Sequence, residues 1–174
     1  ALLPFALVLL ASCAKDDVDD DTDGGDVVVG PYDATVKWTS YGIPHITAED
    51  YGSLGYGLGY ASAKDHVCTI ADQILKVRSE RARYFGAGDG NVHVHSDIAW
   101  KHLGVRDNAI ADFDQLPSDQ ADLLVGYAAG FSRYIEDTGN DALPAPCRGA
   151  DWVKPIDHID LYSLIFQMGL YGSA

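Results

Sequence analysis

The stretch from Tyr41-Gly-Ile-Pro-His-Ile-Thr47 to Arg83-Tyr-Phe-Gly86 decides the fold of this 174-residue chain. Between its two ends, residues 51–60 alternate glycines with tyrosines and leucines. A glycine in a helix interior costs about 1 kcal/mol relative to alanine, so a run of glycines is kept where two backbones approach closely. The pattern therefore predicts a glycine-faced helix that packs tightly against another element.

The same glycines allow a second interpretation. Gly55-Tyr-Gly57 has the spacing that opens a dinucleotide-binding loop. The third glycine of that fingerprint is absent, and Ser53-Leu54 does not form the strand that should precede the loop. We therefore prefer the helix.

Outward from this stretch, the chain is predicted to be mostly α-helical with one leading β-strand. Residues 32–38 alternate apolar and polar side chains, which is the period of a strand with one buried face. A turn and a short extended piece follow around Pro44, and Thr47 is expected to cap a helix. Further helices are expected over residues 62–84, from 117 to 135 and from a cap at Asp157 onward, while residues 91–116 are less regular and 139–149 form a loop.

The first twelve residues are apolar but too few to span a bilayer, which takes about 20 residues. They are typical of the apolar part of a secretory signal whose charged start has been lost. Leu10-Ala-Ser-Cys13 matches the bacterial lipoprotein box, in which the cysteine thiol receives a lipid. We expect a truncated signal peptide over residues 1–12 and a membrane anchor at Cys13, with a plain signal peptide as the alternative.

An acidic segment follows this cysteine. Residues 14–27 hold seven aspartates and one lysine, so they contribute −6 to the net charge of −14. Because almost nothing in it can be buried, the region 13–30 is expected to be a disordered tether. Its aspartate spacing faintly suggests a calcium loop, but an EF-hand also needs a final glutamate and flanking helices. The negative charge of the whole chain argues against nucleic acid as a partner.

The chain has three cysteines, of which Cys13 is assigned to the lipid. An exported protein sits in an oxidising compartment, where two remaining cysteines are more often paired than free. We predict a disulfide between Cys68 and Cys147, with two buried thiols as the alternative.

No self-contained catalytic set stands out in the sequence. His93-Val-His95 with Asp97 invites a zinc interpretation, but a zinc site needs a further ligand, and a loop with exposed histidines is preferred. There is no Gly-x-Ser-x-Gly elbow, and no serine or cysteine has an evident base beside it. We predict no metal, no cofactor and no catalytic residue in this chain.

Five segments, taken in order, resemble the N-terminal part of the penicillin acylase family. They are Val36–Ile46 with its Gly-Ile-Pro-His-Ile, Leu54–Asp65, Arg78–Gly86, Gly126–Ile135, and Trp152 before Pro155. The Arg-Tyr-Phe-Gly ending and the segment 147–155 resemble the acyl-homoserine lactone and aculeacin-type acylases. The chain departs from the family pattern at Ser132, where an asparagine is usual, and at His66, where arginine or asparagine is frequent.

The resemblance implies an N-terminal nucleophile hydrolase with an αββα sandwich. Residues 31–174 would be the alpha-chain domain, and a beta chain cut from the same precursor would complete the sandwich and supply the nucleophile. The implied function is hydrolysis of the amide bond of N-acyl substrates such as N-acyl-homoserine lactones, with roles in quorum quenching or antibiotic biosynthesis. The expected location is the bacterial periplasm or cell surface. The alternative is a non-catalytic exported lipoprotein that binds through acylase-like helices.

Within this chain, the last helix is the candidate for one wall of an acyl pocket. The residues proposed to lie near the acyl chain are Phe166, Gln167, Met168 and Leu170. A long acyl chain needs an apolar slot, and methionine adapts its shape to such a surface. The alternative is that these four are ordinary residues of an interhelical interface.

Overall fold

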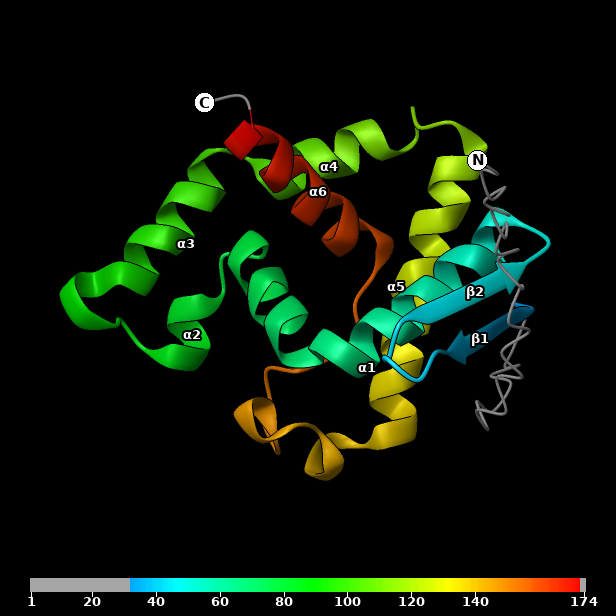
Figure 1. Cartoon of the computed structure of the whole chain (residues 1–174). Helices are drawn as coiled ribbons and strands as arrows, with labels where there is room; N and C mark the ends of the chain where they lie inside the picture. Colours follow the sequence, from blue (N-terminus) through cyan, green and yellow to red (C-terminus); the bar gives the residue numbers. More distant parts are fainter. Residues whose placement is uncertain (1–31, 173–174) are drawn as a thin grey trace, which may run out of the picture.

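The computed structural model describes residues 32–172, and within them it shows six α-helices and one two-stranded sheet (Figure 1). The elements are β1 (Ala34–Trp38), β2 (Pro44–Ala48), α1 (Tyr51–Val77), α2 (Arg81–Phe85), α3 (Val92–His102), α4 (Val105–Phe113), α5 (Ser118–Thr138) and α6 (His158–Gly172). The mostly helical class is therefore confirmed. The predicted signal peptide, Cys13 and the acidic tether lie outside the described residues. Within 32–172 no helix is both long enough and apolar enough to cross a membrane.

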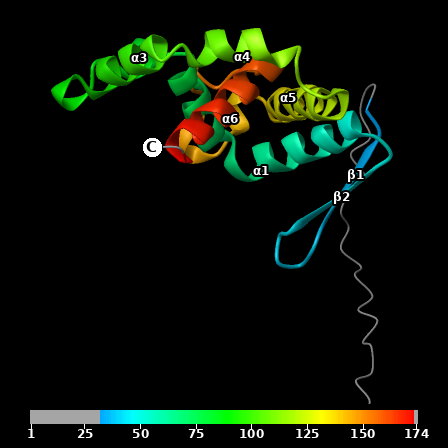
Figure 2. The ribbon, with the colours of Figure 1, turned by 90° about the horizontal axis from the view of Figure 1, so that it is seen from above.

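The leading strand has a partner. β1 and β2 form an antiparallel hairpin whose register pairs Val36 with Ile46, so the expected short extended piece is a second strand. The buried side chains of β1, Ala34 and Val36, face α1. A Cβ added at Gly57 of α1 would lie 2.7 Å from the Ile46 side chain, so glycine lets the helix approach the sheet. Figure 2 shows the hairpin extending away from the helices.

The start and the length of α1 differ from the sequence prediction. Asp50, not Thr47, is the N-cap: its carboxylate accepts a 2.7 Å hydrogen bond from the backbone N–H of Ser53, while Thr47 is paired within β2. The predicted start of a second helix at residue 62 is also wrong. α1 runs on through a kink at His66 to Val77, and α2 is a separate short helix after Ser79, whose φ is +59°.

The predicted close packing of the glycine-faced helix is confirmed, and α5 is its partner. Cβ atoms added at Gly55 and Gly59 of α1 would lie 2.1 Å from backbone carbonyl oxygens of α5. The contact is reciprocal, because added Cβ atoms at Gly126 and Gly130 of α5 would lie 1.9 and 2.0 Å from carbonyl oxygens of α1. Four glycines thus let two helix backbones touch, and the loop interpretation of Gly55-Tyr-Gly57 is wrong.

The region 91–116 is helical rather than irregular. α3 and α4 occupy most of it, joined at Gly104, which has a φ of +63°. His93 and His95 therefore lie in a helix, neither in a strand nor in a loop. Side chains two positions apart on a helix point in different directions, so these two cannot share a ligand as they would on a strand.

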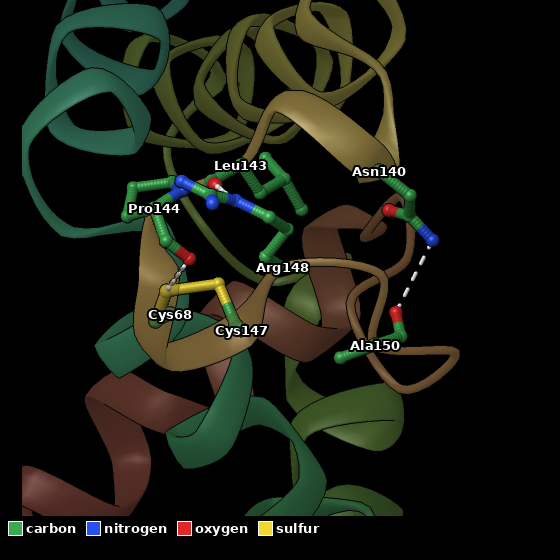
Figure 3. Close-up of a disulfide and its surroundings, with 7 residues drawn as sticks. All are labelled: Cys68, Asn140, Leu143, Pro144, Cys147, Arg148 and Ala150. Atoms are coloured by element: carbon green, nitrogen blue, oxygen red, sulfur yellow. Dashed lines mark hydrogen bonds between the residues drawn. A yellow bond between two sulfur atoms is a disulfide. The ribbon is translucent and has the colours of Figure 1, made fainter.

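Cys68 and Cys147, the pair expected from the sequence, form a disulfide in the structure (Figure 3). The bond joins α1, two residues after its kink, to a short turn 79 positions later. Hydrogen bonds from Arg148 to Leu143 and from Asn140 to Ala150 hold the loop around it.

Ser132, one of the two positions that depart from the family pattern, joins α5 to the segment that precedes α6. Its hydroxyl donates to the carbonyl oxygen of Ile156 at 3.2 Å and accepts from the N–H of Ile156 at 3.0 Å. The start of α6 is thus fixed to α5 by a reciprocal pair of hydrogen bonds.

Candidate functional site

α6 buries several polar residues and exposes several large apolar ones. Its buried positions include the polar residues Asp160, Ser163 and Gln167. Its exposed positions include Ile165, Met168 and Tyr171, which are 41%, 56% and 59% exposed. A helix at the surface of a complete domain normally turns its apolar side inward. The outward apolar face of α6, defined by these three residues, is therefore the strongest candidate in residues 32–172 for a functional surface.

The inward side of α6 is held by a buried carboxylate. Asp160 is 0% exposed, and its Oδ1 accepts hydrogen bonds from Arg78 Nε at 2.7 Å and from Arg106 Nη1 at 2.5 Å. Its Oδ2 accepts from Arg78 Nη2 and from the backbone N–H of Asp157. Because Arg78 ends α1 and Arg106 lies on α4, one carboxylate joins three helices.

Asp157 and Asp160 also cap α6 reciprocally. The N–H of Asp160 donates to Asp157 Oδ1 at 2.8 Å, which confirms Asp157 as the cap. Burial acts to raise the pKa of Asp160, but the hydrogen bonds from Arg78 and from the Asp157 backbone and the charges of Arg78 and Arg106 outweigh it, so the pKa of this carboxyl lies below its ordinary value. Asp160 is consequently an anion at neutral pH, matched by two cations.

At the other end of α6, Tyr171 is in contact with the end of α1. Lys76 Nζ donates a 3.0 Å hydrogen bond to the Tyr171 hydroxyl oxygen, and the ring of Trp100 lies edge-on to the Tyr171 ring with centroids 5.7 Å apart. The hydrogen bond from Lys76 lowers the pKa of the Tyr171 phenol. Gln167, buried beside it, has an Oε1 atom without a hydrogen-bond partner among the described residues.

The structure separates the four residues proposed for the acyl pocket. Met168 is exposed, Gln167 is buried, and Phe166 and Leu170 are half-buried. Phe166 and Leu170 pack against the cluster formed by Val77, Trp100 and Val105. Of the four, Met168 belongs to the outward apolar face. Ile165 and Tyr171 belong to it as well and were missed, because a helix with apolar residues on several sides does not reveal which side turns outward.

A groove of about 450 Å³ adjoins this face. Ile165 and Tyr162 of α6 form one side of it, and residues from the start of α1 and of α5 form the other. The lining residues outside α6 are Tyr51, Leu116, Pro117, Asp119, Gln120, Leu123 and Leu124. Its volume falls within the range of small-molecule sites, and its lining is largely apolar.

The histidines and acids of the described part hold no metal site. No group of three or more His, Cys, Asp or Glu side chains within 32–172 could bind an ion. The hydroxyl of Ser53, which is buried, donates to Asp50 and accepts from the N–H of Asp33, so it serves the start of α1.

Three comparisons agree on the kind of protein to which this chain is similar. The sequence pattern of penicillin amidase matches residues 33–171. Aculeacin-A acylase of Actinoplanes utahensis is 40% identical over 145 residues, and acyl-homoserine lactone acylase PvdQ of Pseudomonas putida is 39% identical over 135 residues. These matches cover 76% and 75% of this chain but 18% of each relative, so the chain spans about a fifth of their length.

The fold has a counterpart among solved structures. A thermostable penicillin G acylase from Alcaligenes faecalis superimposes with a TM-score of 0.72 and 25% sequence identity. The superposition covers 80% of this chain and 74% of the other chain. Sequence and structure therefore point to the same group of enzymes.

Proposed function

The chain belongs to the penicillin amidase family, and we propose that it is the N-terminal, alpha-chain part of an acylase that hydrolyses the amide bond of N-acyl substrates. The observation that carries this proposal is the match to amide-hydrolysing acylases over almost all of the described residues. The outward apolar face of α6 supports it, because such a face is expected where the rest of the enzyme packs against this part.

The proposed chemistry is acyl transfer to water. A serine at the start of a beta chain, cut from the same precursor, attacks the amide carbonyl, and its own α-amine takes the hydroxyl proton. The C–N bond then breaks, the amine leaves with that proton, and water hydrolyses the acyl-serine ester to release the acid and restore the serine. Donors on the beta chain hold the oxyanion that develops on the carbonyl oxygen. The contribution of this chain is to bind and orient: α6 and the groove beside it would form part of the acyl pocket and of the contact with the beta chain.

The proposed substrates are acyl-homoserine lactones or related acylated compounds such as aculeacin A. This choice follows the names of the two relatives, one an acyl-homoserine lactone acylase and the other an aculeacin-A acylase. An apolar groove next to Ile165 and an adaptable Met168 both suit an acyl chain. Homoserine lactones with short and long acyl chains are therefore the first compounds to assay.

We also propose that the protein is exported and anchored by a lipid at Cys13. The lipoprotein-box pattern Leu10–Cys13 and the acidic tether after it support this, and the paired Cys68 and Cys147 suit an oxidising compartment. Replacement of Cys13 by serine in the complete gene should move the protein from the membrane fraction to the soluble fraction. Retention of the Cys13→Ser variant in the membrane fraction would contradict the anchor.

The central test is expression of the complete precursor, followed by mass measurement and assay. Two chains and release of free fatty acid from acyl-homoserine lactones are expected. Alanine in place of the first residue of the second chain is the matched control and should leave the precursor uncut. A precursor that is active while still a single chain would refute the mechanism, and an inactive two-chain protein would refute the substrate class.

A further inference from the structure

The apolar contacts that α6 makes with the other helices come mostly from partly buried side chains, namely Leu164, Phe166 and Leu170. Leu161, which is 8% exposed, is its one buried large apolar residue among the described residues, and the other buried positions are Asp160, Ser163 and Gln167. Apolar packing is non-directional, whereas a guanidinium that binds a carboxylate at two points fixes its geometry. The contacts of Asp160 with Arg78 and Arg106 are therefore directional contacts, away from the exposed surface, that hold α6 against both α1 and α4.

Resting on the proposed acylase function, we infer that Asp160, clamped by Arg78 and Arg106, is a positioning residue for acyl-chain selection. The carboxylate faces inward in the first turn of α6, and the acyl-facing candidates Ile165 and Met168 follow one and two turns later on the same rigid helix. A rotation or shift at Asp160 is carried to both of them. The clamp would thus set the depth and shape of the acyl slot without touching substrate.

Selectivity is the property that such a clamp should affect most. One methylene more or less in an apolar pocket changes kcat/KM by about 10- to 200-fold, so a small shift of a pocket wall alters the preference between chain lengths. A brace with a purely structural role would lower the activity toward all substrates alike. The ratio of kcat/KM values for two chain lengths therefore separates the two roles.

Arg106 offers the mildest way to loosen the clamp. It makes one hydrogen bond to Asp160 and a 3.3 Å contact with the exposed Asp157. In Arg106→Gln, Asp160 would keep both bonds from Arg78 and the backbone bond from Asp157, so the buried carboxylate remains paired. Arg106→Lys keeps the positive charge but replaces the planar guanidinium with a single flexible ammonium group. Its effect on the position of α6 should therefore be smaller than that of Arg106→Gln.

A matched control lies on α5. Arg133 forms an ion pair with Asp137 at 2.8 Å within α5. Arg133→Gln therefore removes one arginine from one ion pair, but that pair does not connect two helices. Neither residue belongs to the site described above. This variant should leave both readouts unchanged.

The experiment uses the complete protein and two readouts. Hydrogen exchange of the α6 amides should become roughly tenfold faster in Arg106→Gln and change little in α5. The ratio of kcat/KM for dodecanoyl- over hexanoyl-homoserine lactone should shift by about tenfold or more in the same variant. Arg106→Lys should fall between this variant and the unchanged protein in both measurements.

The outcomes are distinguishable. Unchanged α6 exchange in Arg106→Gln would overturn the inference, and faster exchange with an unchanged ratio would reduce the clamp to a structural brace and overturn its role in selection. If the unmutated complete protein hydrolyses neither lactone, the proposed function fails instead, and the exchange result alone then supports or overturns the positioning of α6 by Asp160.

Discussion

Helices α5 and α6 both pack against α1, but they divide their side chains in opposite ways. α5 buries only apolar residues and glycines, and its exposed positions include Asp122, Glu136 and Asp137. α6 buries Asp160 and Gln167 and exposes an isoleucine, a methionine and a tyrosine.

The difference distinguishes the closely packed α1–α5 pair from α6, which exposes an apolar face without a covering element among the described residues. The α1–α5 pair is closed by four glycines and tied to its loop by the disulfide, and it contributes Val67, Ile74 and Phe131 to the main buried cluster. The outward apolar face of α6 is removed from water only if another part of the protein covers it. The four predictions that follow test this contrast, from the largest expected effect to the smallest.

Loss of the disulfide between α1 and the loop around Cys147 should lower the free energy of unfolding more than any other change. In Cys68→Ser/Cys147→Ser the unfolded chain regains the freedom of a loop of 79 positions, which the chain-entropy model values at about 4.5 kcal/mol. Urea unfolding of the complete protein, with and without the two substitutions, measures this loss. A double variant as stable as the parent would show that the loop around Cys147 is held by its other contacts.

Loss of the Asp160 charge should come next. Asp160→Asn leaves two arginines without their carboxylate, at a cost of about 4 kcal/mol. Because the folded pKa of Asp160 is lowered, its contribution to stability is present above the ordinary carboxyl pKa of about 3.9 and is lost as the pH falls through the lower folded value. The stability difference between the parent and Asp160→Asn should thus be constant near neutrality and shrink below about pH 4. A difference that persists unchanged in acid would contradict the charge network.

Alanine substitutions at two helical glycines should change the stability of the protein in opposite directions. Gly130→Ala places a Cβ 2.0 Å from the carbonyl oxygen of Tyr56 and should destabilise the protein by about 3 kcal/mol. Gly169 of α6 has nothing within 4 Å of an added Cβ, so Gly169→Ala should raise helix stability by about 0.5–1 kcal/mol. Thermal unfolding compares the two. Equal effects would contradict the contrast between α5 and α6.

Tyr171→Phe should have the smallest effect. The hydrogen bond from Lys76 to the Tyr171 hydroxyl is exposed, so its loss should lower the free energy of unfolding by about 0.5 kcal/mol or less. The same variant should remove a phenol that titrates below the ordinary tyrosine range in an ultraviolet titration. A titration curve identical to that of the parent would show that Lys76 does not hold this hydroxyl.

The elements predicted correctly from the sequence are those with a regular spacing of apolar residues or a run of glycines that signals close backbone packing. The leading strand, the glycine-faced helix, the helix from Ser118 and the Asp157 cap were confirmed. α3 and α4 were missed because both begin after residues with positive φ, Asn91 and Gly104, and carry mixed side chains without a strong apolar face. The choice between Thr47 and Asp50 as a cap depended on a strand pairing that the local sequence does not show.

The role of Phe166, Gln167, Met168 and Leu170 in an acyl pocket stays a prediction. The sequence indicated the last helix and Met168 but not the direction in which its faces turn. That direction depends on Asp160, which is held by arginines 82 and 54 positions away. Such distant pairings are set by the tertiary fold, and no local pattern of residues 158–172 contains them.

Met168 offers the most direct test of whether the outward apolar face of α6 is covered in the complete protein. It is the only methionine of this chain and is 56% exposed within it. Peroxide oxidation of Met168 in the complete protein can be followed by mass spectrometry of its peptide, before and after denaturation in urea. We predict that the native complete protein oxidises at Met168 at least about tenfold more slowly than the denatured protein, because the remaining part of the proposed acylase is expected to cover the outward apolar face of α6. Equal rates in the native and denatured protein would contradict the account.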